Sequence, residues 1–201
     1  MGEGLLNPSQ DGQTPISEED RQGLLLPITT LQELNDAEAA NILICQTWLF
    51  ARKRRISSTS ILTTSWIKAL HRRMFNEVWR WAGEFRNLDT NIGVAKENIS
   101  YELSALIEDI KAKVKAREEW SLSEEEIAIE LAYKAVLIHP FPNGNGRWAR
   151  DLGDALMISL NKNRFTWGSK LNPDVRRAAM LTSIRKADAG DLVSYLKFAK
   201  S

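Results

Sequence analysis

The residues best suited to chemistry lie between His139 and Arg150, where the chain reads His-Pro-Phe-Pro-Asn-Gly-Asn-Gly-Arg-Trp-Ala-Arg. The imidazole of His139 has an ordinary pKa of about 6.5, which suits a general base. A glycine-rich turn at 144–146 follows, and such turns before a helix present backbone N–H groups to anions. Arg147 and Arg150 would share the first turn of that helix, and guanidinium groups bind phosphate through several hydrogen bonds. A base, an anion-binding turn and two cations indicate phosphoryl or nucleotidyl transfer.

This string resembles the Fic family signature, His-Pro-Phe-x-(Asp/Glu)-Gly-Asn-Gly-Arg-x-x-Arg, at every fixed position except Asn143. Trp81-Ala82-Gly83-Glu84-Phe85-Arg86 resembles the part of the Fic core that leads into a substrate-docking flap. The resemblance covers roughly residues 61–160. The N-terminal runs Leu-Leu-Leu-Pro and Glu-Leu-Asn-Asp-Ala-Glu-Ala-Ala-Asn-Ile are similar to the Fic subfamily called mobile mystery protein B.

The resemblance implies a protein adenylyltransferase, which transfers AMP from ATP to a Ser, Thr or Tyr hydroxyl of a target protein and releases pyrophosphate. His139 would remove the hydroxyl proton, and the two arginines would hold the β- and γ-phosphates. The side chain of Asn145 would add an N–H donor to the anion hole. The expected nucleotide-binding residues are Gly144, Asn145, Gly146, Arg147 and Arg150.

Asn143 departs from the family at the position where an acidic residue binds Mg²⁺. An amide oxygen is a suitable ligand for a hard cation, but it brings no negative charge. We therefore expect Mg²⁺ as a cofactor, with reduced affinity for this chain.

Residues 87–95 contain Thr, Ile, Val and Gly without a helical stripe, which predicts a small β-hairpin. In the Fic family the corresponding flap holds the target by strand addition, through main-chain bonds that read little sequence. The residues expected to dock the target are Asn91, Ile92, Gly93 and Val94.

Glu33 has two interpretations. Many Fic proteins carry an inhibitory Ser/Thr-x-x-x-Glu-Gly/Asn helix, whose glutamate pairs with the second motif arginine. Thr29 and Glu33 keep that spacing, although Leu34 stands at the Gly/Asn position. Glu33 is therefore either a brake on Arg150 or the partner of Thr30 in a capping box.

Two rival functions stay open beside AMP transfer. One keeps the fold but changes the chemistry to another phosphate transfer, or to removal of AMP with Glu33 orienting water. The other is a weakly active scaffold in a toxin–antitoxin-like mobile module, bound to an antitoxin-like or regulatory partner. Asn143 supports the scaffold, whereas the intact turn and both arginines favour a triphosphate donor.

The composition is that of one globular domain: 201 residues, 43% hydrophobic and 26% charged. A net charge of +1 gives no strong nucleic-acid or membrane signal. The N-terminus lacks a secretory pattern, and no apolar run approaches the ~20 residues of a membrane span. We expect a cytoplasmic protein, with the single cysteine, Cys45, in the core.

Apolar periodicity and capping residues predict an all-α domain over 28–201, preceded by an extended or mobile arm at 1–27. His71 is predicted to lie on a helix surface or in a groove, because basic residues surround it. The basic run 52–55 is expected to cap the first helix. The expected helices span 30–54, 63 or 64 to 83, 99–115, 121 or 123 to 138, 146–160, 173–186 and 191–199.

Overall fold

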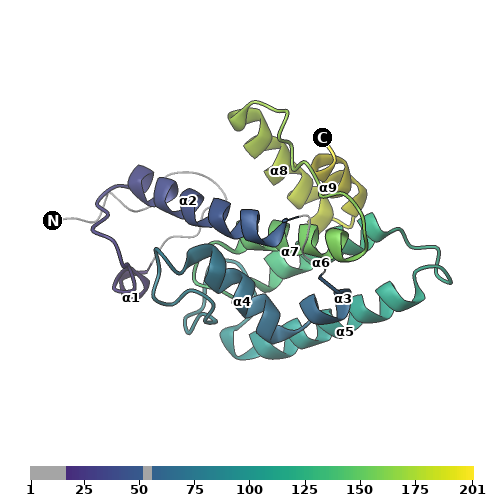
Figure 1. The fold of residues 1–201 in the computed structure, drawn as a ribbon, viewed down its shortest axis with the longest axis horizontal. Coiled ribbons are helices and arrows are strands. Elements are labelled where there is room, and N and C mark those ends of the chain that lie inside the picture. Colours follow the sequence, from purple (N-terminus) through teal and green to yellow (C-terminus); the bar gives the residue numbers. More distant parts are fainter. Residues whose placement is uncertain (1–16, 52–55) are drawn as a thin grey trace.

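The computed structural model describes residues 17–51 and 56–201, and within them the regular elements are helices (Figure 1). The longer ones are α2 (Leu31–Leu49), α4 (Thr64–Phe75), α5 (Ile99–Ala116), α6 (Glu124–Ile138), α7 (Asn145–Ser159), α8 (Pro173–Asp188) and α9 (Leu192–Ala199). The short ones are α1 (Glu18–Arg21), α3 (Ser58–Ile61) and the 3₁₀ turn η1 (Lys96–Asn98). The prediction of a mainly helical fold is confirmed, although α1 and α3 were not foreseen.

Helices α6 and α7 pack together in the centre of the molecule (Figure 1). Helix α5 packs along α6, α9 contacts α6 and α8, and α2 pairs with α4. Both central helices carry side chains that are removed from solvent, including Leu131 on α6 and Leu152 on α7. Burying one such side chain contributes about 1.5–3 kcal/mol. The short connection between α6 and α7, residues 139–144, is therefore held by two well-packed helices.

Capping residues place several helix starts where the sequence predicts them. Thr30 and Glu33 form a capping box at α2, and Ser123 and Glu126 form another at α6. The side chain of Thr63 caps α4. Each cap satisfies backbone N–H groups that lack a partner within the helix, which contributes about 1 kcal/mol.

Helix α4 ends at Phe75 and does not reach Gly83 as predicted. The reason is a backbone pairing between distant segments. Leu25 N–H donates to Val78 O at 2.9 Å, and Arg80 N–H donates to Gly23 O at 2.8 Å. These bonds use groups that a continuing helix would need, so the chain turns instead.

The predicted N-terminal arm is packed on the core from residue 17 onwards. Leu24 forms an isolated antiparallel bridge with Trp79, and the indole N–H of Trp81 donates to Asp20 O at 3.0 Å. Leu25 and Leu26 remain exposed. Residues 1–16 of the arm and the basic run 52–55 lie outside the described residues.

Cys45 is fully buried in the core, as predicted. Among the helices that the structure describes, none combines the length and the apolar character needed to cross a bilayer.

Candidate active site

His139 is the residue at which α6 ends, and its backbone adopts the left-handed conformation, with φ 53° and ψ 58°. Its side chain is almost completely buried. This burial lowers the pKa of His139 to about 4; a hydrogen bond with the Val136 backbone opposes the shift and the charge of Arg86 adds to it. The imidazole is therefore neutral at physiological pH, which is the state that a general base requires.

The side chain of Asn145 closes the loop that follows His139. Phe141 N–H donates to Asn145 Oδ1 at 2.9 Å, and Asn145 Nδ2–H donates to Phe141 O at 2.8 Å. Asn145 is 2% exposed, so its amide shapes the loop from inside. The predicted donation of this side chain to phosphate stays a prediction, and in this structure the amide closes the loop.

The two glycines of the motif serve different purposes. Gly144 has φ 78°, and a Cβ atom there would lie 2.4 Å from the Phe75 ring, so the fold itself requires glycine. A Cβ atom on Gly146 would meet nothing within 4 Å, so packing does not require it. Gly144, the N-cap of α7, provides no side-chain cap. The start of α7 therefore has no side-chain cap and leaves space beside Gly146, an arrangement that suits an anion.

We predict that Gly146→Ala stabilises the fold but weakens nucleotide binding. Alanine in this first turn should raise the free energy of unfolding by roughly 0.4–1 kcal/mol. The added methyl would fill the space that the phosphates are expected to use. Thermal unfolding and ATP titration of the same variant check both parts. Unchanged ATP affinity would mean that phosphate does not approach Gly146.

The two motif arginines contact different parts of the molecule. Arg147 Nη2 lies 2.6 Å from Glu38 Oε2 on α2, and its guanidinium lies 5.2 Å from the centroid of the Phe75 ring. Arg150 Nη1 lies 3.1 Å from the sulfur of Met180 on α8. Burial lowers the pKa of Arg150. The structure therefore places both arginines on the first turns of α7, with Arg147 engaged by a carboxylate.

That carboxylate belongs to Glu38, whereas the sequence considered Glu33 as a partner of Arg150. Glu33 Oε2 accepts the N–H groups of Thr29 and Thr30 at 2.9 and 3.0 Å in the exposed capping box. Of its two interpretations, the structure supports the cap. Glu38 is 2% exposed, and its other oxygen accepts the indole N–H of Trp79 at 2.7 Å. Sequence reasoning missed Glu38, although an acid within the buried stripe of α2 was the available signal.

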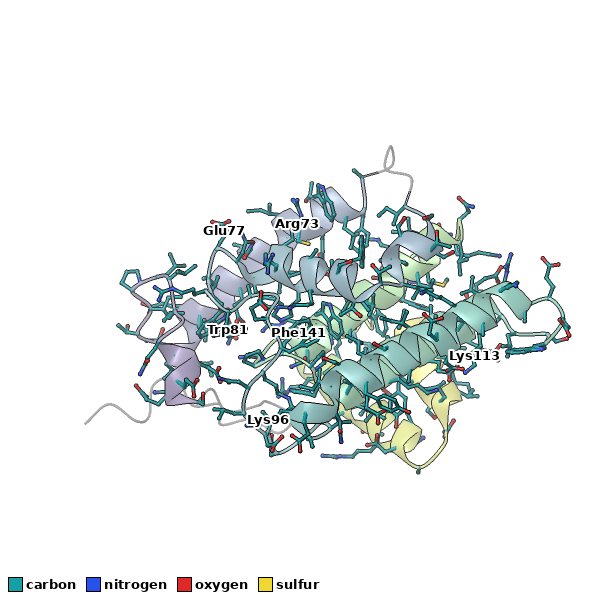
Figure 2. The ribbon with its side chains drawn as sticks, turned by 90° about the horizontal axis from the view of Figure 1, so that it is seen from below. Arg73, Glu77, Trp81, Lys96, Lys113 and Phe141 are labelled. Carbon is teal, nitrogen blue, oxygen red and sulfur yellow. The ribbon has the colours of Figure 1, made fainter. Side chains whose placement is uncertain are left out.

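His71 is fully buried, which corrects its predicted position on a surface or in a groove. Gly83 N–H donates to His71 Nδ1 at 3.0 Å, so the proton resides on Nε2, which lies 3.0 Å from Asn143 O. Burial lowers the pKa of His71 to about 3. Its ring stacks on Phe141 with centroids 3.7 Å apart. His71 thus connects the motif loop to the segment around Trp81. Figure 2 labels Phe141 and Trp81, the two aromatic residues that the His71 ring contacts.

The side chain of Asn143 makes a hydrogen bond within the motif loop. Its Oδ1 accepts the N–H of Gly144 at 2.5 Å, and its carbonyl faces His71. Within 17–51 and 56–201, no group of three or more His, Cys, Asp or Glu residues is placed to hold a metal ion. Mg²⁺ binding through the amide oxygen of Asn143 and phosphate oxygens therefore stays a prediction.

The flap segment 87–95 is a loop, and the predicted β-hairpin is wrong. The guanidinium of Arg86 donates hydrogen bonds to the carbonyls of Leu88 and Val94. A hairpin would use these carbonyls as acceptors for cross-strand hydrogen bonds. Val94 N–H donates to Ile138 O at 3.3 Å. A Cβ atom on Gly93 would lie 2.7 Å from His139 Cβ.

The segment expected to dock the target is therefore brought next to the expected base. Asn91, Ile92 and Gly93 are exposed there, and Val94 is half-buried.

Comparison with known proteins agrees with this arrangement. The model of the Fic/DOC family matches residues 61–157. Protein adenylyltransferase fic-1 of Caenorhabditis briggsae is 27% identical over 184 residues, which is 88% of this chain. The chain spans only 33% of that protein's length.

Solved structures share the fold. A Fic-1 fragment from C. elegans has a TM-score of 0.64 and 22% identity, covering 88% of this chain and 50% of its own. BepC from Bartonella tribocorum, solved with bound AMPPNP, has a TM-score of 0.64 and 16% identity, covering 92% of this chain and 97% of its own. The family match includes the loop of His139 and most of α7. Residues 61–157 are therefore similar to the Fic/DOC family, and the helical fold around them is shared with solved Fic structures.

Proposed function

We propose that this chain is a protein adenylyltransferase that transfers AMP from ATP to a Ser, Thr or Tyr hydroxyl of a target protein. The observation that carries the proposal is the start of α7. There, an uncapped helix N-terminus and the open space over Gly146 lie next to the loop of His139. Helix N-termini favour anions, and the two arginines add the cations that a triphosphate needs.

In this reaction His139 takes the proton from the target hydroxyl. The oxygen attacks the α-phosphorus, the bond from that phosphorus to the bridging oxygen breaks, and pyrophosphate leaves. The new bond is a phosphodiester between AMP and the target. Arg147 and Arg150 stabilise the charge that grows on the pyrophosphate.

Arg147 can take part only after Glu38 releases it, which gives the enzyme a resting, inhibited state. In that state Glu38 occupies the guanidinium that would otherwise meet phosphate. This contact differs from the one considered for Glu33, because Glu38 pairs with the first motif arginine, Arg147, and not with Arg150.

The experiment that tests the proposal is incubation of the protein with labelled ATP, followed by mass spectrometry of the chain and of added target proteins. An AMP adduct on a hydroxyl side chain is the expected product. If labelled ATP is consumed but no AMP adduct forms on protein, the chain catalyses another transfer reaction. If neither the parent nor a Glu38 variant turns over ATP, the scaffold is favoured. Two observations support the scaffold: Asn143 replaces an acidic residue, and Arg147 is paired with Glu38.

We predict that Asn143→Asp lowers the Mg²⁺ concentration needed for half-maximal activity. Mg²⁺ here arrives with the nucleotide as part of the substrate, and the added carboxylate would contribute a charged ligand. Activity and ATP binding are titrated against Mg²⁺ for both proteins. An unchanged midpoint would show that position 143 does not face the metal. Asn143→Ser is the matched control, since it removes the amide without adding charge.

A further inference from the structure

Arg86 is a buried cation outside the motif. Its side chain is 2% exposed, and among the described residues it pairs with the carboxylate of Asp89, with Nη1 3.5 Å from Oδ1 and Asp89 itself 64% exposed. Removing a guanidinium from water is costly unless its donors are satisfied. In this chain backbone carbonyls satisfy them.

Those carbonyls come from both sides of the active site. Arg86 Nε–H donates to His139 O at 2.7 Å, and Nη1–H donates to Leu88 O at 2.9 Å. Nη2–H donates to Val94 O at the other end of the flap. The backbone N–H of Arg86 donates to Pro140 O at 2.9 Å. One side chain therefore joins the flap and the backbone of the expected base.

This connection matters because His139 is held in a backbone conformation that side chains rarely adopt. A left-handed non-glycine residue costs about 1–2 kcal/mol. The bond from Arg86 to the His139 carbonyl stabilises that conformation and so fixes the direction of the imidazole. The bonds to Leu88 and Val94 fix the flap relative to the same point.

We infer that Arg86 is a positioning residue. It holds the 87–95 flap at a fixed position relative to the His139 backbone, so that the hydroxyl of a docked target lies next to the imidazole. This role rests on the proposed function, in which the flap holds the target. The hydrogen bonds of Arg86 to His139, Leu88 and Val94 do not depend on that function. Lysine cannot replace Arg86, because an ammonium group lacks the planar set of five donors that reaches three carbonyls.

The test compares Arg86→Lys with Arg80→Lys, a matched change at an exposed arginine of the same segment. For Arg86→Lys we expect the kcat of transfer to fall on the order of 100-fold, as for a misplacement of about 1 Å. ATP affinity should stay within about twofold, since α7 supplies the phosphate contacts. Arg80→Lys should leave both unchanged. Equal kcat in Arg86→Lys and the parent would overturn the role.

Two measurements keep the inference testable if transfer is never observed or if Arg86→Lys fails to fold. In the parent, hydrogen exchange should show the Arg86 Nε–H and the Val94 amide to be protected; rapid exchange of either would contradict the connection. Arg86→Gln should also raise the pKa of His139, because it removes the adjacent charge, whereas the pKa of His71 should not move. The chain has only two histidines, so NMR titration separates them.

Discussion

Replacing His139 with alanine is expected to abolish AMP transfer while leaving ATP bound. Proton abstraction by a placed base contributes on the order of 10²–10⁴-fold to such a reaction. The proposed phosphate contacts lie on α7, which carries Arg147 and Arg150, so ATP affinity should change little. Transfer rate and ATP affinity are measured on the same purified variant. Full transfer activity in the variant would exclude His139 as the base.

Folding and chemistry are separated by His139→Asn. Asparagine tolerates the left-handed conformation at the end of α6 better than alanine does, yet it cannot accept a proton at this pH. An inactive but stably folded His139→Asn assigns the loss to chemistry.

The pH dependence gives a third readout. A base with a pKa of about 4 is disabled only when protonated. Activity should therefore be flat at neutral pH and fall only as the pH approaches that value.

The elements that could be predicted from the sequence are those fixed by neighbouring residues. Ser123 and Glu126 lie three residues apart, and together they define the start of α6. The motif loop likewise depends on local contacts, such as those between Phe141 and Asn145. Short-range hydrogen bonds of this kind are visible as spacings in the chain.

The features that could not be predicted depend on residues far apart in the sequence. Helix α4 ends early because segment 23–25 pairs with the chain beyond Phe75. The flap is a loop because the side chain of Arg86 competes for its carbonyls. Contacts of this range override local propensity, and no spacing within either segment signals them.

The comparison of Glu33 with Glu38 shows that local spacing and long-range packing can identify different candidates for an inhibitory glutamate. Thr29 and Glu33 have the spacing of an inhibitory motif. A capping box, however, also needs a glutamate at position 33, and it forms from neighbouring residues alone. Glu38 shares the buried stripe of α2 with Leu34 and Ile42. An acid in such a stripe requires a buried partner, and only the packing of α2 near α7 identifies Arg147 as that partner.

Glu38→Gln is expected to raise ATP affinity on the order of 10- to 100-fold and to increase transfer. A charge-assisted hydrogen bond contributes about 1.5–3 kcal/mol, and each 1.4 kcal/mol corresponds to a factor of ten. Glutamine keeps an oxygen for the Trp79 indole N–H and similar volume, so the fold is preserved. Arg147 is about one-third exposed, so water solvates it once the pair is lost. ATP titration and automodification with labelled ATP measure the effect.

Glu33→Gln is the matched control, because it removes the same charge from the same helix. It should weaken the capping box, lower the stability slightly and leave ATP affinity unchanged. If Glu38→Gln instead binds ATP no better than the parent, while Arg147→Ala still weakens binding, then Glu38 does not compete with phosphate. Its carboxylate would then serve only to hold Trp79 and Arg147 in the fold. If Glu33→Gln alone activates the enzyme, the inhibitory contact lies at the start of α2 and forms in a conformation other than this one.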